Sequence, residues 1–217
     1  MTGRARLLAA ALVLAVVATG VWSARHTWLR AAGESLVCAP GDADAYAEAV
    51  LIDNVDPNYC LFDAARGLQV RGQATTVLVP MLRPPSDDEP VAVTRGIIDL
   101  MCTTAGIERC QVFETHAREP ISLNLARHVA DELDARDIRS VRLVTPGFRS
   151  KRSLEVYASV FGPRGIVVHC HPVFGAQDTS NWLDSAHGIQ DVVLQFLKLW
   201  YYRILVLPSA ANASARQ

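Results

Sequence analysis

Short apolar segments alternate with longer amphipathic stretches through most of this 217-residue chain. The apolar segments are rich in β-branched residues, which is typical of strands buried on both faces of a parallel sheet. Strands that alternate with helices form βαβ units with right-handed crossovers. The pattern therefore predicts an α/β fold with a mainly parallel sheet and helices on both faces. The predicted strands are 49–52, 75–80, 109–114, 141–145 and 165–173.

Two of the amphipathic stretches have clear helical character. Between Pro120 and Arg136 an apolar residue recurs at every fourth position, and a proline suits the first turn of a helix. The recurring residues are Ile121, Leu125, Val129 and Leu133. The stretch from Trp182 to Leu207 is more strongly apolar, but Lys198 and Arg203 argue against a membrane span. We expect a terminal helix that packs on the sheet.

The N-terminal region combines a cationic start with a long apolar run, which is typical of a signal sequence. Eighteen uncharged residues lie between Arg6 and Arg25, and this is about the lower limit for a helix that crosses a bilayer. Trp22 and Trp28 lie where aromatic residues gather at membrane interfaces. We predict an N-terminal transmembrane helix, a signal anchor in the cytoplasmic (inner) membrane. A cleaved signal peptide is the alternative.

The predicted anchor divides the chain into four parts. Gly, Pro and charged residues without periodicity follow it and are typical of a linker or a covering segment. The end of the chain is short and polar. The expected parts are an anchor at 1–30, a linker at 31–44, the α/β domain at 45–207 and a polar tail at 208–217.

Charge and cysteine content narrow the class of protein further. The formal net charge is −1, which argues against general nucleic-acid binding, because phosphate affinity needs an excess of Lys and Arg. The five cysteines contain no C-x-x-C pair. Cys102 and Cys110 flank a short turn and are the best candidates for a disulfide; Cys38 with Cys60 is a second candidate, and Cys170 is expected to be a free core thiol. A disulfide implies an oxidising compartment, so we expect the domain to face the periplasm or the cell exterior.

The strand at 141–145 ends in a Thr-Pro-Gly turn that leads into a cationic helix start. Ligands of α/β proteins collect beyond the carboxyl ends of the strands, so cations at this place favour an anionic ligand. Cations at a helix amino end also oppose the helix dipole, which a bound anion would offset. We predict that Thr145, Arg149 and Arg152 bind an anion.

Polar residues at other strand ends complete the candidate site. Asp53 or Glu114 is the candidate general base, and Asn54 and His171 are candidate ligand-binding residues. His169 and His171 share a strand face, but we interpret them as hydrogen-bonded structural residues and expect no metal. The chain has no nucleophile elbow, Gly-rich dinucleotide loop or P-loop, so no cofactor is expected by those routes.

With the anchor, the segment 144–152, and a late Trp182 followed by Lys198 and Tyr201, the chain resembles the YdcF/SanA/ElyC-like family. The resemblance runs from about Tyr46 to Arg203. It implies a Rossmann-like α/β domain, often membrane-anchored and facing the periplasm. Members of the family are associated with cell-envelope integrity and peptidoglycan precursor metabolism.

The family pattern Val-Thr-Ser-x-x-His-x-x-Arg covers the cationic turn. Thr145 and Arg152 match it, and Arg149 replaces the His. A second pattern, Glu-x-x-Ser-x-Asn-Thr-x-Glu-Asn, is matched at Glu114 and then lost, and 51–54 lacks the family's Gly-rich turn. The chain is therefore expected to be a divergent member.

Three functional hypotheses follow from these observations. The first is a membrane-anchored envelope protein that binds, or binds and processes, a phosphorylated or carboxylated envelope precursor, either a small molecule or lipid-linked. The second is a non-catalytic envelope scaffold for protein partners. The third is a binder of a nucleotide or of S-adenosylmethionine, which the missing Gly-rich turn disfavours.

Overall fold

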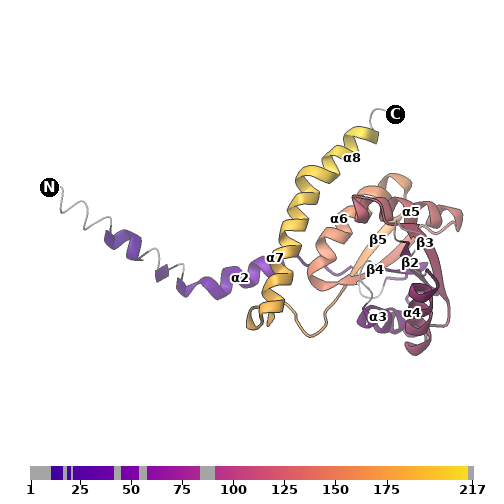
Figure 1. The fold of residues 1–217 in the computed structure, drawn as a ribbon, viewed down its shortest axis with the longest axis horizontal. Coiled ribbons are helices and arrows are strands. Elements are labelled where there is room, and N and C mark those ends of the chain that lie inside the picture. The colour runs from indigo at the N-terminus through magenta and orange to yellow at the C-terminus, as the bar shows by residue number, and fades with distance from the viewer. Residues whose placement is uncertain are drawn as a thin grey trace.

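Five parallel strands form one sheet in the described part of the computed structural model, in the order β3-β2-β1-β4-β5 (Figure 1). This is the order of Rossmann folds, in which the chain reverses direction across the sheet between β1 and β4. The predicted α/β fold with a Rossmann-like parallel sheet is confirmed. The strands are β1 (Ala49–Ile52), β2 (Thr76–Arg83), β3 (Cys110–His116), β4 (Ser140–Pro146) and β5 (Val167–Val173). The structure describes residues 11–16, 19–20, 22–41, 45–53, 58–83 and 91–214.

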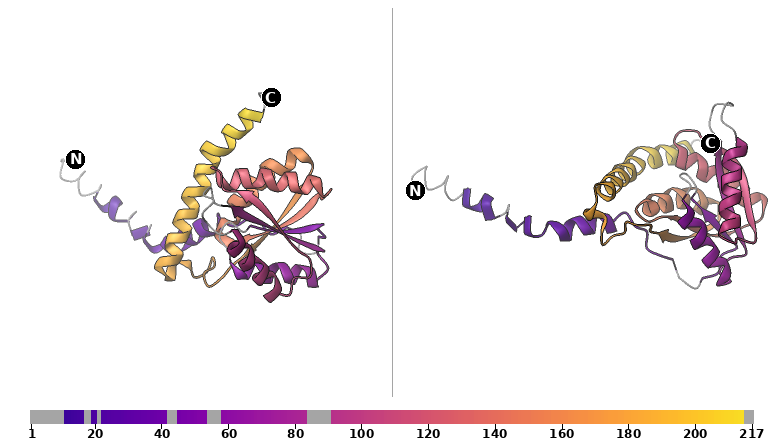
Figure 2. Two further views of the ribbon diagram at one scale, coloured as in Figure 1. Left: turned by 45° about the vertical axis from the view of Figure 1, so that its right-hand side comes forward. Right: turned by 60° about the horizontal axis from the view of Figure 1, so that its bottom comes forward.

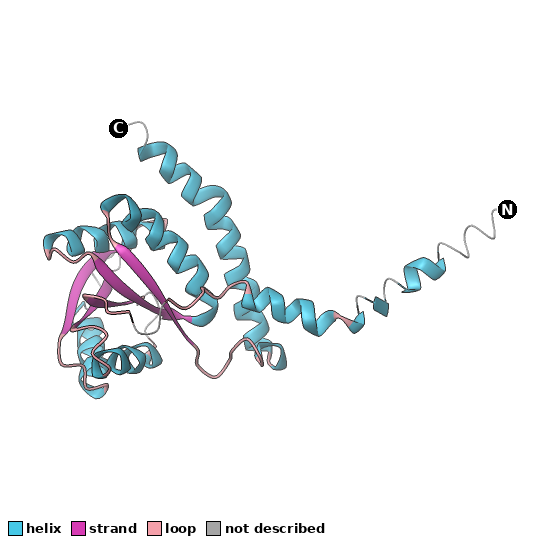
Figure 3. Cartoon of the chain, turned by 180° about the vertical axis from the view of Figure 1, so that it is seen from behind, coloured by secondary structure: helices cyan, strands magenta, loops and turns pink. Residues whose placement is uncertain are grey.

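Helices cover both faces of this sheet (Figures 2 and 3). Val50 and Ile52 of β1 pack under α3 and α4, whereas Leu51 packs under α5 and α6. Because β1 is covered on both sides, all four of its residues are buried, which explains its unbroken apolar sequence. These helices are α3 (Tyr59–Val70), α4 (Val91–Thr104), α5 (Ile121–Ala135) and α6 (Ser150–Phe161).

The helix predicted between Pro120 and Arg136 is confirmed as α5. Leu125, Val129 and Leu133, which recur at the predicted spacing, are fully buried against the sheet. Burial of such a stripe is the main source of helix stability in a protein of this size.

The C-terminal helices take a different position from the one predicted. Apart from its chain neighbours η3 and η4, helix α7 has its main contacts with a short 3-10 turn, η1, and with α6, so it lies beside the helical layer and not on the sheet. The polar tail expected from 208 onward contains α8, and Leu207 and Ala210 pack against the core. These elements are η1 (Gly147–Arg149), η3 (Trp182–Asp184), α7 (Ala186–Tyr201), the π-helical turn η4 (Tyr202–Val206) and α8 (Leu207–Ser214).

The start of α7 depends on a glycine. A Cβ atom at Gly188 would lie 2.4 Å from the carbonyl oxygen of Trp182, and backbone atoms cannot move aside cheaply. We expect Gly188→Ala to lower the free energy of unfolding by about 1–3 kcal/mol, as overpacking does. Gly162→Ala is the matched control, because nothing lies within 4 Å of its Cβ position. Equal urea midpoints for the two variants would contradict this packing.

The structure corrects the prediction of an N-terminal transmembrane helix. Among the residues that the structure describes, no helix is both long enough and apolar enough to cross a membrane. Helix α2 (Arg25–Glu34) carries Arg25, Arg30 and Glu34, and its end packs against Trp182 of the domain. Part of the predicted span, residues 7–10, 17–18 and 21, lies outside the described residues.

The predicted linker contains a buried segment. Leu36 and Cys38 are each only 1% exposed, and Leu36 packs with Phe148 and Trp182 in a small separate core. Of the two alternatives that the composition left open, this part of 31–44 is a covering segment. We name residues 36–38 the covering segment.

Candidate functional site

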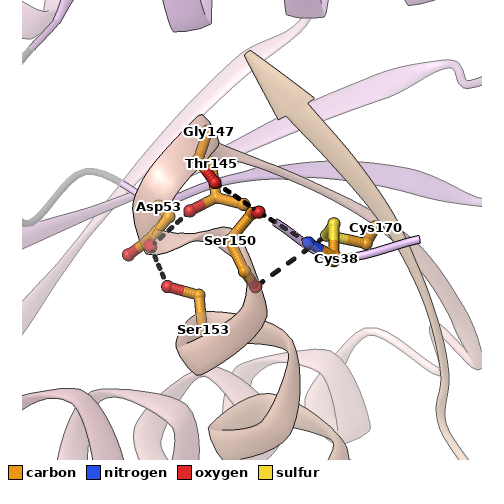
Figure 4. The surroundings of a disulfide bond; sticks show 7 residues. All are labelled: Cys38, Asp53, Thr145, Gly147, Ser150, Ser153 and Cys170. Carbon is orange, nitrogen blue, oxygen red and sulfur yellow. Dashed lines mark hydrogen bonds between the residues drawn. A yellow bond between two sulfur atoms is a disulfide. The ribbon is translucent and has the colours of Figure 1, made fainter. Parts of the chain in front are cut away.

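The carboxyl ends of β1 and β4 meet where the strand order reverses, at the place where open α/β sheets bind ligands. Asp53 follows β1, and its carboxylate accepts hydrogen bonds from the hydroxyls of Thr145 (2.9 Å) and Ser153 (2.5 Å), as Figure 4 shows. The side chain of Asp53 is almost fully buried. A carboxylate that accepts hydrogen bonds from hydroxyl groups in this way has the geometry of a general base toward them.

Tyr157 of α6 extends this cluster into the core. Burial raises the pKa of Tyr157 well above its usual value, the negative charge of Asp53 raises it further, and Arg149 opposes both effects. The phenol therefore stays protonated and can donate a hydrogen bond. Its Oη atom has no hydrogen-bond partner among the described residues. A buried polar atom without a partner is uncommon in native proteins and costs free energy.

Arg149 and Arg152 lie at the junction of β4 and α6, and their side chains are only 9% and 7% exposed. Arg152 donates from Nη1 to Ser122 Oγ (2.9 Å) and from Nη2 to Gln195 Oε1 (3.4 Å). Its guanidinium also lies 5.3 Å from the centre of the Tyr202 ring. The amide of Ser122 in turn donates to Tyr202 Oη (3.2 Å). Helices α5, α6 and α7 and the π-helical turn thus converge on one arginine.

The covering segment lies over the amino end of α6. The amide of Lys151 donates to the carbonyl of Leu36 (3.0 Å), and the amide of Cys38 donates to Ser150 Oγ (2.9 Å). Ser150 Oγ also donates to the carbonyl of Gly147 (2.5 Å; Figure 4). The sequence analysis predicted that this helix start would bind an anion. In the structure, the amide of Lys151 and the hydroxyl of Ser150 already form hydrogen bonds within the protein.

A disulfide joins Cys38 of the covering segment to Cys170 of β5 (Figure 4). Both the prediction of a free Cys170 and the Cys38–Cys60 pairing were wrong. Cys170 points to the α6 side of β5, where the covering segment passes, while Cys60 is free and exposed. The predicted Cys102–Cys110 disulfide is present.

Two predicted site residues lie away from the cluster around Arg152. Glu114 is exposed on the edge strand β3, two strands from β1, and pairs with Arg83 (3.9 Å). His171 is opposite Val144, which packs under α3, so it lies on the other side of the sheet from Thr145. Asn54 lies outside the described residues.

His171 should contribute to the pH dependence of stability. Burial lowers its pKa below 6.5, and the charges of Arg142 and Arg71 lower it further. The unfolded chain therefore binds a proton before the folded chain does, so stability is full above pH 6.5 and is lost as pH falls through the folded pKa. Replacement by Gln should flatten the decline in free energy of unfolding between pH 7.5 and 5.5, measured by urea titration. An unchanged slope would contradict this role.

No family model and no curated protein matches the chain. The chemistry of the site therefore rests on its own residues. Among the residues that the structure describes, no group of three or more His, Cys, Asp or Glu side chains could hold a metal ion.

Of the predicted residues, the structure joins Asp53 to Thr145 and places Arg149 and Arg152 at the start of α6, where the neighbouring Ser153 bonds Asp53. It also adds residues that the sequence analysis did not propose. These are Ser122, Ser153, Tyr157, Gln195 and Tyr202. One signal for Ser122 was present, because the Glu-x-x-Ser-x-Asn pattern fits at Glu119, Ser122 and Asn124 when it is aligned five residues later. Gln195 and Tyr202 had no such signal.

Proposed function

We propose that this protein binds an anionic ligand, phosphorylated or carboxylated, at the reversal point of its sheet. The observation that carries the proposal is the pair of nearly buried guanidiniums, Arg149 and Arg152, beside the carboxyl end of β4. A guanidinium is planar and presents several donors, so it suits phosphate and carboxylate groups. Asp53 accepts hydrogen bonds from Thr145 and from Ser153, the residue that follows Arg152 in the chain.

We further propose that the ligand is a cell-envelope precursor and that the domain works outside the cytoplasm. The resemblance of the segment 144–152 to the YdcF/SanA/ElyC-like family supports the ligand class. Two disulfides, Cys38–Cys170 and Cys102–Cys110, support the compartment, because disulfides persist in oxidising environments. Counting free thiols on the natively folded protein tests the compartment: one reactive cysteine is expected, and five would contradict it.

A thermal-shift screen tests the ligand class. The protein is heated with phosphate, pyrophosphate, isoprenoid phosphates, dicarboxylates, nucleotides or S-adenosylmethionine. A ligand at a hundred times its dissociation constant stabilises the folded state by about 2.7 kcal/mol, which is readily measured. Shifts with the first four classes support the proposal. Shifts confined to nucleotides or S-adenosylmethionine would replace it with the third hypothesis.

Tyr157→Phe separates binding from folding at this site. The change removes only the phenol oxygen, which is buried without a partner among the described residues. We expect the free energy of unfolding of the free protein to stay equal or to rise, since the cost of the buried hydroxyl is removed. We expect ligand affinity to fall by about tenfold, the value of one hydrogen bond. Unchanged affinity would remove Tyr157 from the site.

A non-catalytic scaffold is the second candidate function. The closure of the α6 amino end by the covering segment favours it, because Leu36 and Cys38 occupy positions that a ligand would otherwise contact. The two candidates differ in the screen. A scaffold gives no shift with any small anion, and it retains a protein partner when Arg152 is replaced.

A further inference from the structure

The outer face of α7 is apolar and exposed. Seven large hydrophobic residues of this helix are at least 38% exposed, and Leu197 reaches 63%. They are Ile189, Val193, Leu194, Phe196, Leu197, Trp200 and Tyr201. A shallow groove of about 540 Å³ runs along part of this face. Exposed apolar surfaces of this extent mark interaction sites in soluble domains. We name these seven residues the outer face of α7.

The outer face is wide. At 100° per residue, it spans an arc of about 160° from Phe196 to Leu194, with Gln190 as its polar interruption. A partner helix needs a narrower stripe, the seam of a and d positions, so a second copy that packs through α7 would leave much of this face in water. A flat apolar medium covers such an arc more completely.

The charges and aromatic rings around the face fit a lipid surface. Helix α2 meets η3, which directly precedes α7, where Gly33 lies against the side chain of Trp182 (Figure 1). It exposes Trp28 and Arg30, Trp22 is exposed shortly before it in the chain, and α7 itself exposes Lys198. Tryptophan and tyrosine prefer the headgroup region, and arginine and lysine attract anionic lipids. The acidic residue of α7, Asp191, accepts a hydrogen bond from Gln195 and lies toward the buried side.

We propose that the outer face of α7 docks on an anionic lipid surface as an amphipathic helix lying in the interface. The opposite face of the same helix supplies Gln195 to Arg152, so the lipid would lie about one helix diameter, roughly 10 Å, from that arginine. The docking surface stands on its own observations and does not depend on the anion site.

Tryptophan quenching by brominated lipids tests this proposal on the full chain. In a Trp22→Phe/Trp28→Phe background the remaining tryptophans are Trp182, which is buried, and Trp200, which is on the outer face. The vesicles contain phosphatidylcholine with brominated acyl chains and one-quarter phosphatidylglycerol. We expect quenching of the Trp200 emission by about half, and loss of this quenching when Leu197 is replaced by Glu.

Val70→Glu is the matched control, because Val70 is equally exposed, at 67%, on α3 across the sheet. It should leave the quenching unchanged. Vesicle binding without quenching of Trp200 would overturn the proposal, since the chain would then bind through another surface. Absence of vesicle binding would overturn it as well. A dimer in sedimentation that Leu197→Glu dissociates, with no quenching, would assign the outer face to a second copy instead.

Discussion

Replacing Arg152 with alanine is expected to weaken binding of pyrophosphate or of an isoprenoid phosphate by about 10- to 150-fold. Hydrogen bonds to charged groups contribute about 1.5–3 kcal/mol, and each 1.4 kcal/mol corresponds to a tenfold change in affinity. Arg152 is the residue at which helices from three parts of the chain converge, through Ser122 and Gln195. Isothermal titration of the wild-type protein and the variant measures the change.

Two further variants make the Arg152 result interpretable. Arg109→Ala removes the same charge from an exposed position just before β3, at the amino edge of the sheet, and should leave affinity unchanged. Arg152→Lys keeps the charge but loses the planar donor fork, so we expect an intermediate affinity. Equal losses in Arg109→Ala and Arg152→Ala would show that binding depends on overall charge and not on this site.

Removing the Cys38–Cys170 disulfide, by replacing both cysteines with serine, should cost about 5 kcal/mol of folding stability. The bridge closes a loop of 132 residues, and in the chain-entropy model stabilisation grows with the logarithm of loop length. The Cys102–Cys110 bridge spans only 8 residues, so its removal should cost about half as much, near 2.5 kcal/mol. Urea denaturation under oxidising conditions measures both values.

Cys60→Ser is the control for this series, because Cys60 is free and exposed. Its free energy of unfolding should match that of the wild-type protein. If removal of Cys102–Cys110 costs more stability than removal of Cys38–Cys170, the disulfide to Cys170 is not what holds the covering segment in place. It would then be held mainly by its contacts with Ser150 and Lys151.

The sheet was predictable because its signals are local. All five strands begin within two residues of their predicted starts, since apolar β-branched runs and the turns between them are read over a few residues. The pairing of β4 with β5 was not predictable in the same way. In the observed register His171 lies opposite Val144, whereas Thr145 lies opposite Pro172, so the side chains of His171 and Thr145 are on different faces of the sheet. The sequence alone does not give that register, so His171 was grouped with the wrong face.

The site was only partly predictable because its contacts are long-range. Arg152 meets Ser122, thirty residues earlier, and Gln195, forty-three residues later, and only the packing of α5, α6 and α7 sets these distances. The Cys38–Cys170 pairing depends in the same way on where the covering segment crosses β5.

The most direct test of the anion site is the position of a heavy oxyanion in a crystal of this protein. Crystals soaked in tungstate are measured at the tungsten absorption edge, so the anomalous map locates the bound anion. The proposed site predicts a peak within hydrogen-bond distance of the guanidiniums of Arg149 and Arg152. Peaks only at exposed cations such as Arg109, with none at the reversal point between β1 and β4, would contradict it.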